Sequence, residues 1–199
     1  MDSKPALSIS SLALTLLASL PLTTSQPTNS SRPHFKLHVH NACPFPKSIG
    51  IYSVTPTFEM LQHGPIVNLS SNTHHTLHAP YHSTGMRLSG HAEWGLNGQW
   101  RPQLLFEFGY SAYDTVQGTA YDISMMEGSD DNVGMKVRVL PNGAGSETCE
   151  TKLCLPGDCA PSQGWTSPGQ AELGSPADTV CYRGKADFRL TYCPEKEDH

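Results

Sequence analysis

The sequence is poor in charged residues and has no regular helical periodicity. Only 16% of its 199 residues are Asp, Glu, Lys or Arg, and the 13 basic residues form no run. This distribution argues against binding to the phosphate backbone of nucleic acid. No segment repeats apolar residues with a period of 3.6, and the 17 Gly and 16 Pro interrupt the chain too often for a helical bundle. Since there is no internal repeat either, we expect one helix-poor domain with no nucleic acid partner.

Only one apolar run is long, and it lies near the first residue. Leu12–Leu22 has the length of a signal-peptide core, follows a single cation at Lys4 and is too short to span a bilayer. The small residues Thr23 and Ser25 predict cleavage after Ser25. The sequence therefore predicts a secreted protein with no membrane span. A retained anchor is the alternative, because Asp2 weakens the basic region.

Composition divides the chain into four predicted segments. They are a signal peptide (1–25), a flexible leader (26–33), a folded domain (34–194) and a charged C-terminal tail (195–199). Sequons for N-glycosylation stand at Asn29 in the leader and at Asn68 in the domain, as expected of a secreted glycoprotein.

Alternation of apolar and polar residues predicts β-strands. The pattern has the period of a half-buried strand in Phe35–His40, Met135–Val139 and Ala186–Tyr192. Shorter strands are predicted at Ile49–Val54 and Leu104–Phe108. Turn sequences rich in Gly, Pro, Asn and Ser separate these segments, so the predicted fold class is all-β, an antiparallel β-sandwich or barrel.

The cysteines predict disulfides rather than a metal site. The six are Cys43, Cys149, Cys154, Cys159, Cys181 and Cys193. In a secreted chain they form three bridges most simply, and sequence alone allows fifteen pairings. The gap between Cys154 and Cys159 is too wide for a zinc ribbon, and a second half-site is lacking. Residues 147–179 have little periodicity and much Gly, Pro and Ser, which indicates a loop region held by disulfides.

Several short pieces, in order, resemble the thaumatin-like (osmotin-like) family, in the short secreted form of fungal antigenic or yeast-phase-specific proteins. Phe35–Cys43 (FKLHVHNAC) is similar to the family's opening strand, which ends in Asn-x-Cys. The other similar pieces are Leu105–Phe108, Tyr121–Ser124, Glu127–Met135, Thr179–Cys181 and Phe188–Pro194. Their shared order from Phe35 to Pro194 makes the resemblance specific.

The resemblance implies a β-sandwich of thaumatin-like type and one disulfide pattern. By analogy, the pairs are Cys43–Cys193, Cys149–Cys181 and Cys154–Cys159. On a chain-entropy model, the first bridge contributes about 4 to 5 kcal/mol to stability. The chain has fewer cysteines than plant members and a shorter segment between Cys154 and Cys181. We therefore expect the family's cleft to lack one wall here.

The resemblance also implies an acidic site. Larger members have a cleft of one Arg, one Glu and three Asp, and the matching positions here are Arg87 (with Arg101 as competitor), Glu107, Asp122 and Glu127. The fifth residue has no counterpart that we can place. Strand alternation supports Glu107 and Asp122, because their apolar neighbours would face the core and turn both acids to the opposite face.

Paired carboxyl groups in such a site can either hydrolyse a polysaccharide or only bind it. A pair about 5 to 9.5 Å apart hydrolyses a glycosidic bond if one acid stays protonated and the other ionised. Here Glu107 would be the acid, with Asp122 or Glu127 as nucleophile or base. Alternatively, the carboxyl groups form hydrogen bonds with sugar hydroxyls and do not cleave the glycosidic bond. Because one acid and much of a wall are missing, we expect binding of cell-wall polysaccharide, by analogy β-1,3-glucan, and hold a weak endo-β-1,3-glucanase as the alternative.

Tryptophans offer a second way to hold a sugar. Trp94 and Trp100 stand just before the Glu107 strand, and flat indole faces suit sugar rings. Packing of these two and of Trp165 inside the protein is the alternative.

The ten histidines form a third candidate set. His38 and His40 share one face of the first strand, and His74, His75 and His78 crowd together later. Imidazoles bind Cu or Zn, but solvated histidines are commoner, so we expect no metal and no cofactor. Protonation below about pH 5.5 would reverse the formal charge of −5 and favour anionic walls. We expect a monomer. The remaining alternative is a secreted antigen that contacts a host surface, or a histidine metal-binding protein, without a sugar site.

Overall fold

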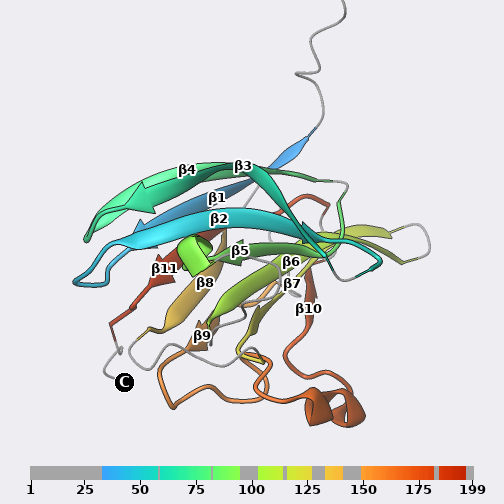
Figure 1. The fold of residues 1–199 in the computed structure, drawn as a ribbon. Coiled ribbons are helices and arrows are strands. Elements are labelled where there is room, and N and C mark those ends of the chain that lie inside the picture. Colours follow the sequence, from blue (N-terminus) through green and yellow to red (C-terminus); the bar gives the residue numbers. More distant parts are fainter. Residues whose placement is uncertain are drawn as a thin grey trace, which may run out of the picture. The chain divides into compact units, whose positions relative to one another are not determined.

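Two β-sheets pack face to face around one apolar core, which confirms the predicted all-β sandwich (Figure 1). The computed structural model describes residues 33–57, 59–81, 83–94, 103–113, 116–126, 133–140, 149–181 and 184–195. Within these ranges there is no α-helix, and the two helical segments are short 3-10 turns, η1 (Ala92–Trp94) and η2 (Pro168–Leu173).

The first sheet has five strands in the order β4-β1-β11-β8-β9. Their bounds are β1 (His34–Asn41), β4 (Thr73–Pro80), β8 (Met135–Leu140), β9 (Lys152–Cys154) and β11 (Asp187–Tyr192). The opening strand β1 and the closing strand β11 are neighbours and run parallel, whereas the other pairs in this sheet are antiparallel. An antiparallel arrangement was expected throughout, and this pair departs from it. A tight turn makes neighbouring strands antiparallel, but β1 and β11 come from opposite ends of the chain and are not joined by one.

The second sheet has six strands in the order β10-β7-β6-β5-β2-β3, and all its neighbours are antiparallel. Their bounds are β2 (Lys47–Val54), β3 (Met60–Leu69), β5 (Met86–Ser89), β6 (Leu105–Tyr113), β7 (Val116–Ser124) and β10 (Thr179–Cys181). The register of β2 against β3 shifts between Ile49 and Ile51.

Aromatic rings from both sheets fill the middle of the core. Phe35 of β1 and Phe188 of β11 meet Phe106 and Phe108 of β6 and Tyr121 of β7. Several of these rings pack edge to face, with centroids 5.0 Å apart for Phe106 and Phe188 and 5.3 Å apart for Phe35 and Phe108. Such pairs add to the stabilisation that comes from burying their area. The alternation read from the sequence places each of these rings inward.

The strands predicted from alternation coincide with β1, β8 and β11, and the shorter ones with β2 and β6. Sequence alternation missed the edge strands β3 and β4, in which most side chains are exposed, so few apolar residues mark the inward face. The region 147–179 was expected to contain no sheet, and this was wrong for β9, which pairs with the end of the first sheet through three residues.

Three disulfides join the pairs that the resemblance implies. They are Cys43–Cys193, Cys149–Cys181 and Cys154–Cys159. The first connects the ends of the parallel strands β1 and β11 across a sequence separation of 150. The second connects the segment before β9, which belongs to the first sheet, with β10 of the second sheet.

The predicted signal peptide, most of the leader, Asn29 and most of the tail lie outside the described residues. Asn68 is exposed on β3, and its Oδ1 accepts a hydrogen bond from Ser48 Oγ at 2.8 Å. Glycosylation at both sequons stays a prediction. In the part of the chain that the structure describes, no helix is long and apolar enough to cross a membrane.

Candidate functional site

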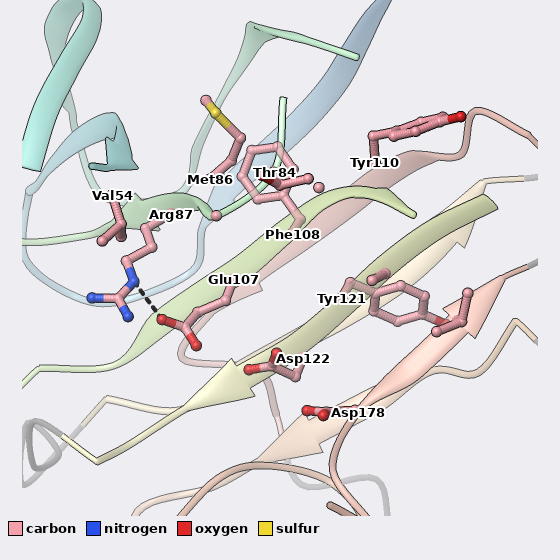
Figure 2. A pocket seen from close by; sticks show the side chains of 14 residues that line it. Val54, Thr84, Met86, Arg87, Glu107, Phe108, Tyr110, Tyr121, Asp122 and Asp178 are labelled. Atoms are coloured by element: carbon pink, nitrogen blue, oxygen red, sulfur yellow. Dashed lines mark ion pairs between the residues drawn. The ribbon is translucent and has the colours of Figure 1, made fainter. Parts of the chain in front are cut away.

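Four polar residues form one row across adjacent strands of the six-stranded sheet. The register places Arg87 of β5 opposite Glu107 of β6, and Glu107 opposite Asp122 of β7. Because directly opposed residues point to the same face, these three side chains stand together. The row ends at Asp178, which directly precedes β10, where Thr179 is opposite the residue before Asp122 (Figure 2).

The row lies on the outer face of the sheet, away from the core. Phe106 and Phe108, which flank Glu107, are 0% and 4% exposed, and Tyr121 and Ile123, which flank Asp122, are 1% and 0% exposed. Side chains alternate between the two faces of a strand, so burial of these four neighbours turns both acids outward.

These acids line a pocket of about 430 Å³. Val54 of β2 and Val180 of β10 contribute apolar surface beside the row. Of the described residues in the disulfide-linked segment 155–178, Asp178 alone lines the pocket. The loop region therefore contributes one carboxyl group to this site.

Arg87 holds Glu107 in an ion pair. Arg87 Nε lies 2.5 Å from Glu107 Oε1, and the two side chains are 23% and 20% exposed. A charge-assisted contact of this kind favours the ionised carboxylate and restricts its rotamers. Arg87 therefore lies beside Glu107, and the alternative arginine, Arg101, lies outside the described residues.

The surroundings of Asp122 favour its protonated form instead. Burial above all, followed by the charges of Glu107 and Asp178, raises the pKa of Asp122 to about 8, although Arg87 and Lys152 act in the lowering direction. Its Oδ1 is buried and has no hydrogen-bond partner among the described residues. At neutral pH Asp122 is therefore a protonated carboxylic acid that can donate a hydrogen bond. Glu107, which the sequence interpretation took as the protonated acid, is the residue that Arg87 contacts, and the assignment of roles to the two acids stays a prediction.

Asp178 is the acid that sequence reasoning missed. Trp165 Nε1 donates a hydrogen bond of 2.6 Å to Asp178 Oδ1. Trp165 is in turn fixed to the end of β7, because its backbone N–H donates to Ile123 O at 2.8 Å and its carbonyl accepts from Met125 N at 2.7 Å. Trp165 is half-buried, and its indole N–H is held by Asp178. The only sequence signal for Asp178 was an acid directly before the Thr-Val-Cys strand.

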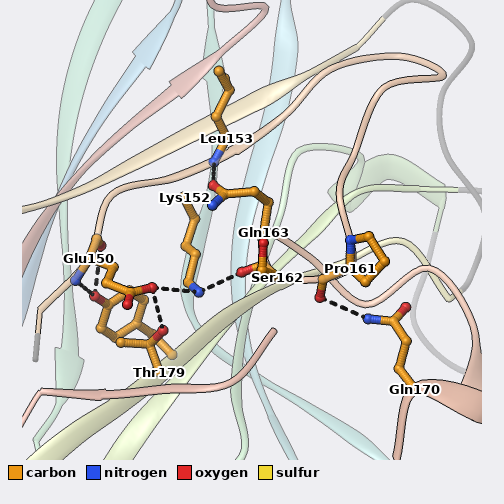
Figure 3. A network of polar contacts seen from close by, with 9 residues as sticks. Glu150, Lys152, Leu153, Pro161, Ser162, Gln163, Gln170 and Thr179 are labelled. Atoms are coloured by element: carbon orange, nitrogen blue, oxygen red, sulfur yellow. Dashed lines mark hydrogen bonds and ion pairs between the residues drawn. The ribbon is translucent and has the colours of Figure 1, made fainter. Parts of the chain in front are cut away.

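A buried lysine of β9 ties the loop region to the segment before β9 (Figure 3). Lys152 is 1% exposed, and its Nζ donates to Ser162 O at 2.8 Å and to Glu150 Oε2 at 3.2 Å. Gln170 of η2 adds a second anchor, because its Nε2 donates to Pro161 O at 3.1 Å. These bonds hold the loop that carries Trp165.

Several predicted site residues cannot be placed. Glu127 and Trp100 lie outside the described residues, as does the side chain of Trp94, whose backbone ends η1.

The histidine candidates lie on the other sheet. His40 and His74 stack with ring centroids 4.0 Å apart, and His38 Nδ1 lies 2.9 Å from Thr76 Oγ1. The register places His78 opposite Lys36 and places His75 opposite the core residue Val39. Among the described residues, no group of three or more His, Cys, Asp or Glu is arranged to hold a metal ion.

The sequence matches no protein-family model and no curated protein. Among solved structures, the protein elicitor MoHrip2 from Magnaporthe oryzae is similar, with 16% identity over 80% of this chain and 99% of that chain and a TM-score of 0.49. The thaumatin-like xylanase inhibitor TLXI is similar with 13% identity over 79% of this chain and 99% of that chain and a TM-score of 0.47. A thaumatin-like protein is thus among the structural neighbours, but similarities at this level carry no argument about ligand or activity.

Proposed function

We propose that the acidic row, Arg87, Glu107, Asp122 and Asp178, binds a carbohydrate, and by analogy with the thaumatin-like family a β-1,3-glucan of the cell wall. The observation that carries this proposal is the buried Asp122 Oδ1, which has no hydrogen-bond partner among the described residues and belongs to a pocket-lining carboxyl group. Pockets that bind small molecules combine apolar walls with a few convergent polar groups of this kind.

The protonation pattern suits sugar hydroxyls. A hydroxyl group both donates and accepts hydrogen bonds, and the row offers a partner for each. Neutral Asp122 is a donor, while a carboxylate at Glu107 or Asp178 is an acceptor. Val54 and Val180 supply apolar surface for the C–H faces of a sugar ring. The row therefore offers both polar and apolar contacts to a single saccharide unit.

The test is binding of the protein to insoluble β-1,3-glucan at pH 5, 7 and 9. Retention is expected at pH 5 and 7 and falls above pH 8, because deprotonation of Asp122 removes the donor and adds a third negative charge to the row. Asp122→Ala should lose retention at every pH. Glu172→Gln removes one exposed negative charge in η2, outside the pocket, and is the matched control. Lack of retention at all three pH values, or full retention by Asp122→Ala, would remove the proposal.

Hydrolysis is a second candidate, favoured by a protonated Asp122 directly opposite an ionised Glu107. Opposed residues in antiparallel strands have Cβ atoms about 4.5 to 5.5 Å apart. Retaining glycosidases hold their two carboxyl groups about 5 to 5.5 Å apart. Glu107→Gln should then abolish release of reducing sugar from β-1,3-glucan, and an unchanged rate would exclude Glu107 as nucleophile.

Secretion belongs to the same proposal. Three disulfides are consistent with an oxidising, extracellular setting. Mass analysis of the protein from culture medium should show a chain that begins near Gln26 and carries glycans at Asn29 and Asn68. An intracellular chain that still starts at Met1 would contradict secretion while leaving glucan binding in vitro to stand or fall separately.

A further inference from the structure

The outer face of the five-stranded sheet, on the side of the sandwich away from the acidic row, carries basic and imidazole side chains. The register places His38 of β1 between Thr76 of β4 and Arg189 of β11, and it places Arg189 opposite Arg138 of β8. One pair further along, His40 lies opposite His74. Directly opposed residues share a face, so these groups form one surface, which we call the basic face.

The alternation of the strands confirms which way this face points. Leu37 and Val39 of β1 and Phe188 and Leu190 of β11 are 0% or 1% exposed, so the residues between them point outward. Arg189 is exposed. The basic face is therefore the solvent side of the sheet, and the core side chains are behind it.

Cations outnumber carboxylates on the basic face. Its described titratable and charged groups, strand by strand, are His74 and His78 of β4, His34, Lys36, His38 and His40 of β1, Asp187 and Arg189 of β11, and Lys136 and Arg138 of β8. His75 borders the face, Lys185 precedes β11, and β9 contributes the uncharged Leu153. The one carboxylate, Asp187, forms an ion pair with Lys185 and accepts a hydrogen bond from Lys36 N. The remaining fixed charges on this face are positive.

Histidines and one arginine surround a shallow pocket of about 460 Å³ on the basic face. Its titratable lining groups are His38, His40, His74, His75 and Arg189. The stacked rings of His40 and His74 would repel each other when both carry a proton. An anion placed between them and Arg189 would relieve that repulsion. The pocket thus becomes a stronger anion site as the imidazoles gain protons.

We propose that the basic face binds an acidic polysaccharide, a chain bearing carboxylate or sulfate groups, and that it does so more tightly at acidic pH. Charge complementarity selects a polyanion. The exposed large apolar residues of the described chain are Phe45, Leu61, Ile66, Met126 and Leu173, and none belongs to a strand of this sheet. Among the described residues, no exposed large apolar side chain of this face is available to insert into a bilayer. Its outward positions hold no Phe, Tyr or Trp on which bases would stack, which disfavours single-stranded nucleic acid.

The net charge of the protein works in the same direction. The formal charge is −5 with neutral histidines, and ten imidazolium groups would change it to +5. Carboxylates with an ordinary pKa near 4 stay ionised at pH 5. At that pH the polysaccharide therefore remains an anion while the protein has become a cation. At neutral pH the overall negative charge opposes the local attraction of the basic face.

The test measures the affinity for immobilised polygalacturonate, a carboxylate polymer, and for heparin, a sulfated one, at pH 5.0 and pH 7.5. Three additional exposed charge contacts amount to about a tenfold gain in affinity. We therefore expect affinity about tenfold higher at pH 5.0, and weakened by added salt. Equal affinity at the two pH values overturns the proposal. Tighter binding to anionic vesicles or to single-stranded DNA than to either polysaccharide overturns it as well.

Two sets of variants test separately the histidines, whose charge depends on pH, and the arginines, whose charge is constant. The triple variant His38→Gln, His40→Gln, His74→Gln should lose most of the dependence on pH, and Arg138→Gln with Arg189→Gln should weaken binding at both pH values. His63→Gln, on β3 of the other sheet, is the matched control and should behave as the parent. Circular dichroism checks folding, and the single variant His38→Gln gives the same information with about a twofold smaller ratio if the triple variant unfolds. A pH dependence as large in the triple variant as in the parent, or one that disappears in His63→Gln, contradicts the proposal.

Discussion

The buried carboxyl group of Asp122 should make the protein less stable as pH rises from about 4 to 8. Its pKa is raised from 3.8 to about 8 in the folded protein, and burial is the main cause. In the unfolded chain the same group releases its proton near pH 4. Between these values the folded state holds one proton more than the unfolded state, so this group lowers the free energy of unfolding by up to about 1.4 kcal/mol per pH unit.

Replacing Asp122 with Asn removes the titrating group and keeps a neutral side chain of the same shape. The free energy of unfolding of Asp122→Asn should therefore match that of the parent near pH 4 and exceed it at higher pH. If the whole interval contributes, the difference approaches about 6 kcal/mol at pH 8 and is constant above it.

Urea unfolding curves of the parent and of Asp122→Asn at pH 4, 5, 6, 7 and 8 measure this difference. Glu172→Gln, which removes an exposed acid of η2, is the control and should follow the parent at every pH. A constant difference between parent and Asp122→Asn across this pH range would refute the reasoning, since it would show that Asp122 titrates alike in the folded and unfolded states.

Three other changes test the fold and the site. Replacing the Cys43–Cys193 pair by serines should lower the free energy of unfolding by about 5 kcal/mol on a chain-entropy model, as measured by urea unfolding, and a loss below about 1 kcal/mol would contradict a role for this bridge in closing the sandwich. Trp165→Phe removes the donor to Asp178 and should weaken glucan binding about tenfold in a pull-down assay, with unchanged binding as the contrary result. Lys152→Met removes one of two cations that lower the pKa of the buried carboxyl, so the pH at which glucan binding is lost should rise; a fall would contradict the assigned charges.

Local patterns predicted the parts of the fold in which one face is buried along several consecutive residues. The alternation in Phe35–His40 and Met135–Val139 gave both the strands and their inward faces, because each apolar side chain there enters the core. The edge strands β3 and β4 face solvent along most of their length, so no comparable pattern exists in Met60–Leu69 or Thr73–Pro80.

In the candidate site, the sequence predicted only those features that depend on a single strand. Alternation turned Glu107 and Asp122 to the outer face, and position in the resemblance suggested Arg87. Asp178 joins them through the pairing of β10 with β7, a register that no local pattern encodes. The protonation of Asp122 rather than Glu107 also depends on tertiary structure, since the burial of one acid and the ion pair of the other both arise from packing.

The most direct measurement is a titration of the Asp122 carboxyl carbon by NMR, with and without a soluble β-1,3-gluco-oligosaccharide. We expect a midpoint of about 8 in the free protein. We also expect a higher midpoint with the oligosaccharide, because a sugar oxygen that accepts a hydrogen bond from the carboxyl group stabilises its neutral form. A midpoint near 3.8, or a midpoint that the oligosaccharide does not move, would contradict carbohydrate binding at a protonated Asp122.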